Sequence, residues 1–102
     1  NINDVSASFV AACIDVLSNK VLRAVEDKKP KTLAVVGGVA ASLQLRERME
    51  KISNTTSTRL CLPPIKWATD NAAMIAMAGW DYHDQGIFTD LEPKPNLKLE
   101  QA

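Results

Sequence analysis

The sequence of 102 residues contains the stretch Thr32-Leu33-Ala34-Val35-Val36-Gly37-Gly38, on which the fold depends. This short apolar run is rich in β-branched side chains and stands between Pro30 and two glycines. Such a run predicts a buried β-strand that ends in a tight turn. A new secondary-structure element is therefore expected directly after the two glycines.

A helix is predicted after the glycines, from about Ala41 to Ile52. Apolar residues at helical spacing, Leu45, Met49 and Ile52, are expected to be buried. The charged residues between them are expected to face water: Arg46, Glu47, Arg48, Glu50 and Lys51. The polar residues 53–56 are expected to form a loop that leaves the helix.

A second strand is predicted from Thr58 to Leu62, and Pro63-Pro64 ends it because proline cannot donate a backbone hydrogen bond. Two strands joined through a helix are expected to lie parallel with a right-handed crossover, which gives an α/β fold. Two strands make a poor sheet, and both are expected to be fully buried. The missing strands are therefore expected to come from elsewhere in a longer parent chain.

Helices are predicted on both sides of this unit, so the element order is helix, strand, helix, strand, helix. The first helix runs from Val5 to Val25 with Asn3 or Asp4 as its N-cap. Its expected buried face consists of Val5, Phe9, Cys13, Val16, Leu17, Val21 and Ala24. The last helix, residues 71–80, is almost wholly apolar and is expected to be buried on most sides. Residues 1–86 are predicted to form one lobe and residues 87–102 an extended tail.

The composition predicts a single hydrophobic core and no strong electrostatic field around the protein. The chain is 46% apolar, and its 12 basic and 12 acidic side chains cancel, so no global charge favours nucleic acid or an anionic membrane. Cys13 and Cys61 stand singly in apolar runs and are expected to be small core residues. Uninterrupted apolar runs are far shorter than the roughly 20 residues of a membrane span, so no membrane contact is expected.

The turn at Gly37-Gly38 is the first candidate binding site. Two glycines between a buried strand and a helix leave backbone N–H groups open to an anion or a nucleotide, and they let a ligand approach closely. The pattern is neither GxGxxG nor a Walker sequence. A plain strand-to-helix turn is the alternative explanation.

The segment from Pro63 to Asn71 is the second candidate site. Asp70 follows a strand of an open α/β sheet, where such folds hold ligands, and its carboxylate is a candidate metal ligand. In the alternative, Thr69 or Asp70 is simply the N-cap of the last helix.

Together these two segments resemble the TsaD family, the universal tRNA threonylcarbamoyladenosine synthesis proteins, in its carboxy-terminal lobe. The resemblance covers roughly residues 4–86. It is carried by Asp4-Val5 and Ser8-Phe9 in the first helix, then Gly37-Gly38-Val39-Ala40-Ala41, Leu45-Arg46, Pro63-Pro64 and Thr69-Asp70-Asn71-Ala72-Ala73-Met74-Ile75-Ala76.

The resemblance implies a ribonuclease H-like lobe of the actin, hexokinase and sugar-kinase ATPase type. ATP or threonylcarbamoyl-AMP would lie between two lobes, and the threonylcarbamoyl group would pass to the N6 amine of the adenine beside the anticodon of a tRNA. By this similarity Asp70 matches the ligand of one divalent metal ion, iron or zinc. Gly37 and Gly38 lie at the adenosine-binding loop, and Ser42 stands where the family has an adenosine-contacting asparagine.

The chain also departs from the family pattern. Besides Ser42, it has Ala68 where a cysteine is common and Val10 where a glutamine is common. The family's HxxxH metal-binding histidines and first phosphate loop belong to its amino-terminal part, so no catalytic residue is assigned here, and His83 is expected to be a surface residue. A nucleotide-binding or scaffold module that kept the fold and lost the chemistry is the second hypothesis.

The amino-terminal part of the same protein is an expected partner, because the apolar faces of the outer helices exceed what two strands can cover. The resemblance implies tRNA as the substrate partner. The resemblance adds a homodimer or helper proteins. Residues 54–57 and the proline-containing tail favour a mitochondrial member of the family; a cytoplasmic one is the alternative.

Overall fold

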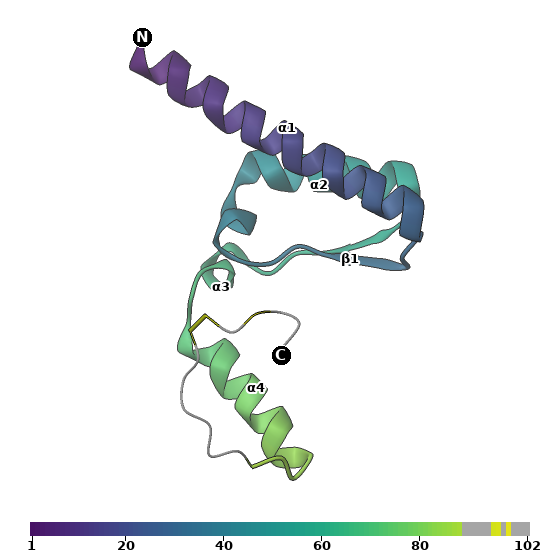
Figure 1. Ribbon diagram of the computed structural model, residues 1–102, viewed down its shortest axis with the longest axis vertical. Helices are drawn as coiled ribbons and strands as arrows, with labels where there is room; N and C mark the ends of the chain where they lie inside the picture. The colour runs from purple at the N-terminus through teal and green to yellow at the C-terminus, as the bar shows by residue number, and fades with distance from the viewer. Residues whose placement is uncertain (89–94, 97, 99–102) are drawn as a thin grey trace. The chain divides into compact units, whose positions relative to one another are not determined.

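The computed structural model describes residues 1–88, 95, 96 and 98, and the chain divides into two compact units, Asn1–Asp70 and the part from Asn71 onward. The elements are α1 (Ile2–Lys28), β1 (Thr32–Ala34), η1 (Gly38–Ala41), α2 (Leu43–Thr56), β2 (Arg59–Cys61), α3 (Ile65–Ala68) and α4 (Ala72–Asp84), as Figure 1 shows. The predicted α/β order is confirmed. Two short helices, η1 and α3, were not predicted, and both lie in the loops that follow the strands.

Helix α1 begins and ends at polar caps. The side chain of Asn1 accepts a hydrogen bond from the N–H of Asn3 at 3.1 Å, so the predicted caps Asn3 and Asp4 are wrong. At the other end Lys29 has a left-handed backbone (φ 47°), and its N–H donates to the carbonyl oxygen of Val25 at 2.8 Å. Pro30 follows, which prevents the helix from continuing.

Helix α1 buries a different face from the predicted one. Its buried residues are Ile14, Ser18 and Val25. The predicted face is largely exposed, with Phe9 at 69% and Cys13 also exposed, so the expectation that this face and Cys13 are buried within the chain is wrong. The helix has apolar residues on more than one side, and α2 covers only the side with Ile14. Figure 1 shows the amino-terminal half of α1 extending beyond α2.

Helix α1 is also long and apolar enough to cross a membrane, with a mean hydropathy of 1.5 over its most apolar 18-residue window. Only 11% of that window is buried. The length of uninterrupted apolar runs did not reveal this, because isolated polar residues such as Ser8 and Asp15 break the runs while the average over the window stays apolar. Length and composition alone do not separate a membrane span from a helix that another protein surface covers.

Strands β1 and β2 pair in parallel with Leu33 opposite Leu60, which confirms the predicted arrangement. The ladder extends through Arg59 N–H to the Lys31 oxygen and Val35 N–H to the Cys61 oxygen, at 3.0 and 3.1 Å. The strands are not fully buried, contrary to expectation: in β1 only Leu33 is half-buried, and Cys61 is half-buried in β2. No further strand covers their edges among the described residues.

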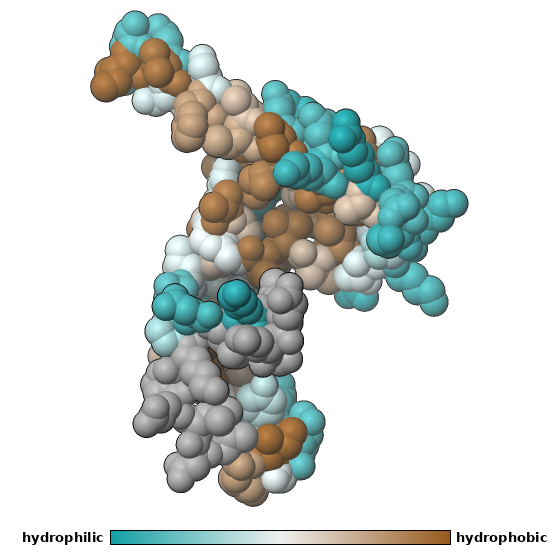
Figure 2. Space-filling model, viewed as in Figure 1, coloured by the Kyte–Doolittle hydropathy of each residue, from teal (hydrophilic) through white to brown (hydrophobic). Residues whose placement is uncertain are grey.

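The core of the first unit lies between α1, α2 and the strands. Its buried residues are Ile14, Leu45, Met49 and Ile52, packed against the partly buried Val21, Leu22, Leu33, Val35 and Leu60. The three residues predicted on the buried face of α2 are therefore confirmed. Figure 2 shows apolar residues gathered between α1 and the strands.

The last turn of α2 corrects the prediction of a loop at residues 53–56. Thr55 Oγ1 donates to the carbonyl oxygen of Lys51 at 2.9 Å, and Thr56 Oγ1 donates to that of Ile52 at 2.7 Å. These side-chain bonds let threonine continue a helix that its polarity appeared to end. Ser57 then closes the helix with a left-handed backbone (φ 54°).

Helix α4 belongs to the second unit and is longer than predicted. None of its residues is buried, and Ile75 and Trp80 are 66% and 64% exposed, so the expectation of burial is wrong for this chain. His83 is exposed, as expected, and its ring stacks on that of Trp80 with centroids 5.9 Å apart. Most of the predicted tail, residues 87–102, lies outside the described residues.

Candidate functional site

The two candidate loops lie at the same edge of the sheet. The diglycine turn follows β1, and the segment from Pro63 to Asp70 follows β2. Because the strands are parallel, their carboxyl ends meet at one edge. This edge is where open α/β sheets bind ligands.

The backbone conformation of the diglycine turn requires glycine at position 37 and does not require it at position 38. Gly37 has φ 93° and ψ 173°, a region that only glycine adopts without strain. Gly38 begins η1 without a left-handed φ, and a Cβ placed on it would meet no atom within 4 Å. A plain turn therefore accounts for Gly37 and not for Gly38.

Ser42 has a defined structural role beside this turn. It is the N-cap of α2, and its Oγ accepts a hydrogen bond from the N–H of Leu45 at 3.4 Å. Its own N–H donates to the carbonyl oxygen of Val39 at 3.0 Å, which closes η1. Asparagine caps a helix about as well as serine, so serine at this position preserves the local backbone.

Asp70 is exposed and is not the cap of α4. The cap is Asn71, whose side-chain oxygen accepts a hydrogen bond from the N–H of Met74 at 2.9 Å. The alternative in which Thr69 or Asp70 serves as the N-cap is therefore wrong. Asp70 lies two residues beyond α3, and α3 packs against η1, so its segment adjoins the diglycine loop.

The residues present do not form a metal site by themselves. Within the described part of the chain, no group of three or more His, Cys, Asp or Glu side chains is placed to hold a metal ion. Asp70 could supply one ligand, and one carboxylate does not complete the coordination shell of iron or zinc.

Arg46 is a further residue whose surroundings were predicted wrongly from the sequence. Its Nε donates to the carbonyl oxygen of Ala40, and its Nη2 donates to that of Pro63, both at 2.6 Å. The side chain is half-buried and joins the two candidate loops, whereas its charge and its place in the helical pattern predicted exposure to water. The available signal was its position one helical turn after Ser42, directly behind the diglycine turn.

A protein-family model matches most of this chain. The family model for TsaD, tRNA N6-adenosine threonylcarbamoyltransferase, matches residues 1–77. The chain belongs to the TsaD family. The match includes both strands, the diglycine turn, Arg46 and Asp70.

Individual TsaD relatives match nearly the whole chain. The tRNA N6-adenosine threonylcarbamoyltransferase of Thermosipho africanus is 42% identical over 98 residues, which cover 94% of this chain and 30% of the relative. The protein with the same name from Lactobacillus delbrueckii subsp. bulgaricus is 44% identical over 103 residues, which cover 97% and 30%. The chain thus spans about 30% of the length of these TsaD relatives.

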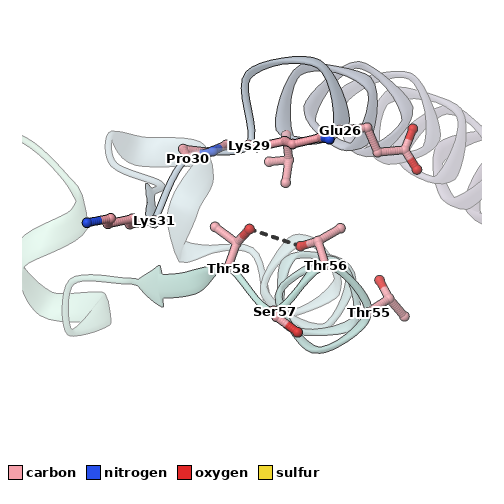
Figure 3. Close-up of a pocket in the computed structure, with 9 residues that line it drawn as sticks. Glu26, Lys29, Pro30, Lys31, Thr55, Thr56, Ser57 and Thr58 are labelled. Carbon is pink, nitrogen blue, oxygen red and sulfur yellow. Dashed lines mark hydrogen bonds between the residues drawn. The ribbon is translucent and has the colours of Figure 1, made fainter.

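A pocket of about 650 Å³ lies between the end of α1 and the end of α2 (Figure 3), at the edge of the sheet opposite the two candidate loops. Its lining includes Lys29, Lys31 and Thr56, and Thr56 Oγ1 bonds to Thr58 Oγ1 at 3.2 Å. None of the predicted site residues lines it. Both helices direct their carboxyl ends, which carry partial negative charge, toward this pocket, so it is poorly suited to a phosphate.

Proposed function

We propose that this chain forms part of a tRNA N6-adenosine threonylcarbamoyltransferase. The observation that carries the proposal is the meeting of the diglycine turn and the Asp70 segment at the carboxyl edge of one parallel sheet, inside the region that matches TsaD. The relatives bear this name, and the chain spans about 30% of their length. The chain would therefore contribute one wall of the active site.

The reaction would join the N6 amine of a tRNA adenosine to the carbamoyl carbon of threonylcarbamoyl-AMP. The bond between that carbon and the phosphate oxygen would break, AMP would leave, and the amine would lose a proton. The chain's proposed part is to hold the nucleotide half of the donor. No described residue is assigned as the acid or base.

The two strands would complete a larger sheet of the actin, hexokinase and sugar-kinase type. Parallel strands are normally covered on both faces, and here Leu33 is only half-buried while its neighbours in β1 are exposed. This incomplete burial supports further strands and helices from the parent chain.

The diglycine turn would hold ATP or threonylcarbamoyl-AMP. Gly38 supports this role because a Cβ placed on it would meet no atom of the chain within 4 Å, so there is room for a ligand to approach its backbone closely. Ser42 would lie beside the adenosine. Because Ser42 still caps α2, its replacement of asparagine gives no structural support to the alternative of an inactive scaffold module.

Asp70 would supply one ligand of a divalent iron or zinc ion, and the remaining ligands would come from outside the described residues. Its exposure and its freedom from the capping role support this assignment. The described residues alone do not complete the site of this ion.

The remaining part of the parent chain would cover the exposed apolar surface of α1 and that of α4. These surfaces include Val5, Phe9 and Val16 on α1 and Ile75, Met77 and Trp80 on α4. Contiguous apolar surface of this kind marks a binding interface, and protein coverage explains α1 without a membrane. A homodimer or helper proteins would add further contacts.

Mitochondrial localisation stays a prediction. Of the two features that favoured it, residues 54–56 belong to α2 and not to a loop, and most of the tail lies outside the described residues.

The test replaces Asp70 by alanine in the full-length protein and measures both tRNA modification and bound iron or zinc. Asp84→Ala is the matched control, because Asp84 is an exposed carboxylate at the end of α4. Loss of modification and of metal in the Asp70 variant alone is expected. Undiminished modification with normal metal content would refute the assignment.

A further inference from the structure

Arg46 connects two segments that are far apart in the sequence. Its Nε bonds to the carbonyl oxygen of Ala40 in η1, and its Nη2 bonds to that of Pro63, which begins the segment leading to α3 and Asp70; both distances are 2.6 Å. Ala40 is 1% exposed and Pro63 is half-buried, so water has little access to the carbonyl side of Ala40. One side chain therefore fixes both loops to the start of α2.

The geometry of the guanidinium explains why an arginine stands here. Its planar fork presents several N–H donors in fixed directions, so it can serve two carbonyl oxygens at once. Hydrogen bonds from a charged donor are shorter and stronger than neutral ones. A lysine amine is a single point charge and is not expected to hold both carbonyls in the same geometry.

The base of the arginine is itself held in place. The N–H of Arg46 donates to the carbonyl oxygen of Ser42 at 3.0 Å, and Ser42 caps the helix. Leu45, the preceding residue, is part of the buried core. The hydrogen bonds of Arg46 thus attach both loops to a part of α2 that is itself held by the core.

We propose that Arg46 is a positioning residue that sets the separation between the nucleotide-binding turn and the Asp70 segment. This inference rests on the proposed function, in which the two loops hold parts of one reacting complex. A displacement of about 1 Å between reacting groups lowers a rate by as much as about 100-fold. The arginine then acts on the rate without touching the substrate.

Arg48 offers a matched comparison on the same helix. Its Nη2 lies 2.7 Å from Asp15 Oδ1 on α1, and both side chains are about half exposed. Such an exposed ion pair contributes little to stability. Arg48→Ala removes the same charge from α2 and leaves both loops untouched.

The test uses the full-length protein with Arg46→Ala, Arg46→Lys and Arg48→Ala. Hydrogen exchange is followed at the amides of Ala40, Ser42 and Trp67, which bond within the two loops to the carbonyl oxygens of Gly37, Val39 and Pro64. Exchange at Trp67 is measured with and without ATP, and kcat and KM for tRNA are measured alongside.

The inference predicts faster exchange in both loops of Arg46→Ala and a fall in kcat of about 10- to 100-fold with KM for tRNA unchanged. Arg46→Lys should recover part of kcat, and Arg48→Ala should match the wild type. ATP should slow exchange at Trp67 in the wild type and in Arg48→Ala, and not in Arg46→Ala.

Several results would overturn the inference. These are a kcat of Arg46→Ala equal to that of Arg48→Ala, an ATP effect at Trp67 that persists without Arg46, or no ATP effect at Trp67 in the wild type. If Arg46→Ala does not fold, Arg46→Lys decides, and an unchanged kcat in that variant counts against the inference. A wild-type protein that binds ATP and transfers nothing refutes the proposed function instead, and the exchange comparison still decides whether Arg46 couples the loops.

Discussion

The side-chain oxygen of Asn71 lies 2.9 Å from the backbone nitrogen of Met74 and accepts its hydrogen bond. This contact makes Asn71 the N-cap of α4 and relieves the neighbouring Asp70 of that role. The sequence Thr69-Asp70-Asn71 contains three residues that are all good caps, so propensity alone could not choose among them. Once the cap is assigned, the exposed carboxylate of Asp70 has no structural task in the helix.

Substitutions at Asp70 and Asn71 are therefore expected to have opposite effects. Asn71→Ala should weaken the start of α4 by about 1 kcal/mol, because one backbone donor loses its partner. Asp70→Ala should leave the helix unchanged. Hydrogen exchange at the Met74 amide in the full-length protein measures this: faster exchange in the Asp70 variant than in the Asn71 variant would contradict the capping assignment.

Substitution of the two glycines of the turn is expected to have different effects: one change lowers stability, and the other weakens nucleotide binding. Gly37→Ala forces an L-residue to φ 93° and should destabilise the loop by about 1–3 kcal/mol. Gly38→Ala should leave the unfolding temperature unchanged or slightly raised, since its Cβ meets open space and the unfolded chain loses entropy. It should weaken ATP binding by about 10-fold if the nucleotide approaches closely.

Isothermal titration with ATP and thermal unfolding of the same samples measure both effects. Gly79→Ala is the control for ATP affinity alone, because Gly79 lies inside α4 and in neither candidate loop, and alanine there is expected to raise helix stability by about 1 kcal/mol. Unchanged ATP affinity in Gly38→Ala would remove the main physical support for a nucleotide at this turn.

Hydrophobic spacing and proline positions predicted the elements that local patterns determine. The two strands, their parallel pairing and the buried set Leu45, Met49 and Ile52 follow from runs and periods that no distant contact overrides. The candidate edge of the sheet follows from the parallel pairing. Asp70 and the glycines could be placed there, although their roles could not be tested from the sequence.

Other features depend on contacts that the sequence does not display. Arg46 looks like a surface charge, and its burial depends on two carbonyl groups supplied by Ala40 and Pro63. Thr55 and Thr56 look like a loop and extend α2 through side-chain bonds to the preceding turn. Helix α1 has apolar residues on several sides, and the choice of buried side depends on where α2 lies.

Met49 is expected to be the most sensitive position in the core. It is 1% exposed and belongs to the buried core between α1, α2 and the strands. Met49→Ala should therefore lower the free energy of unfolding by about 2–5 kcal/mol, through lost contacts and a residual cavity. Met49→Leu conserves the volume and should cost less than about 1.5 kcal/mol. Hydrogen exchange of the α2 amides reports both values, and a cost for alanine no larger than for leucine would contradict the packing described.

Cys13 tests whether the parent chain covers α1. In this chain Cys13 is exposed and Cys61 is half-buried. If protein covers the apolar face of α1, Cys13 in the full-length protein should react with a thiol reagent no faster than Cys61. Rapid labelling of Cys13 that slows only when lipid vesicles are added would favour a membrane contact over protein coverage.

The most direct measurement is a crystal structure of the full-length protein with bound ATP and zinc. The account predicts nucleotide in contact with the backbone of Gly37 and Gly38, and Asp70 among the ligands of the metal in the same cleft. Nucleotide bound away from the turn, or a metal site without Asp70, would contradict it.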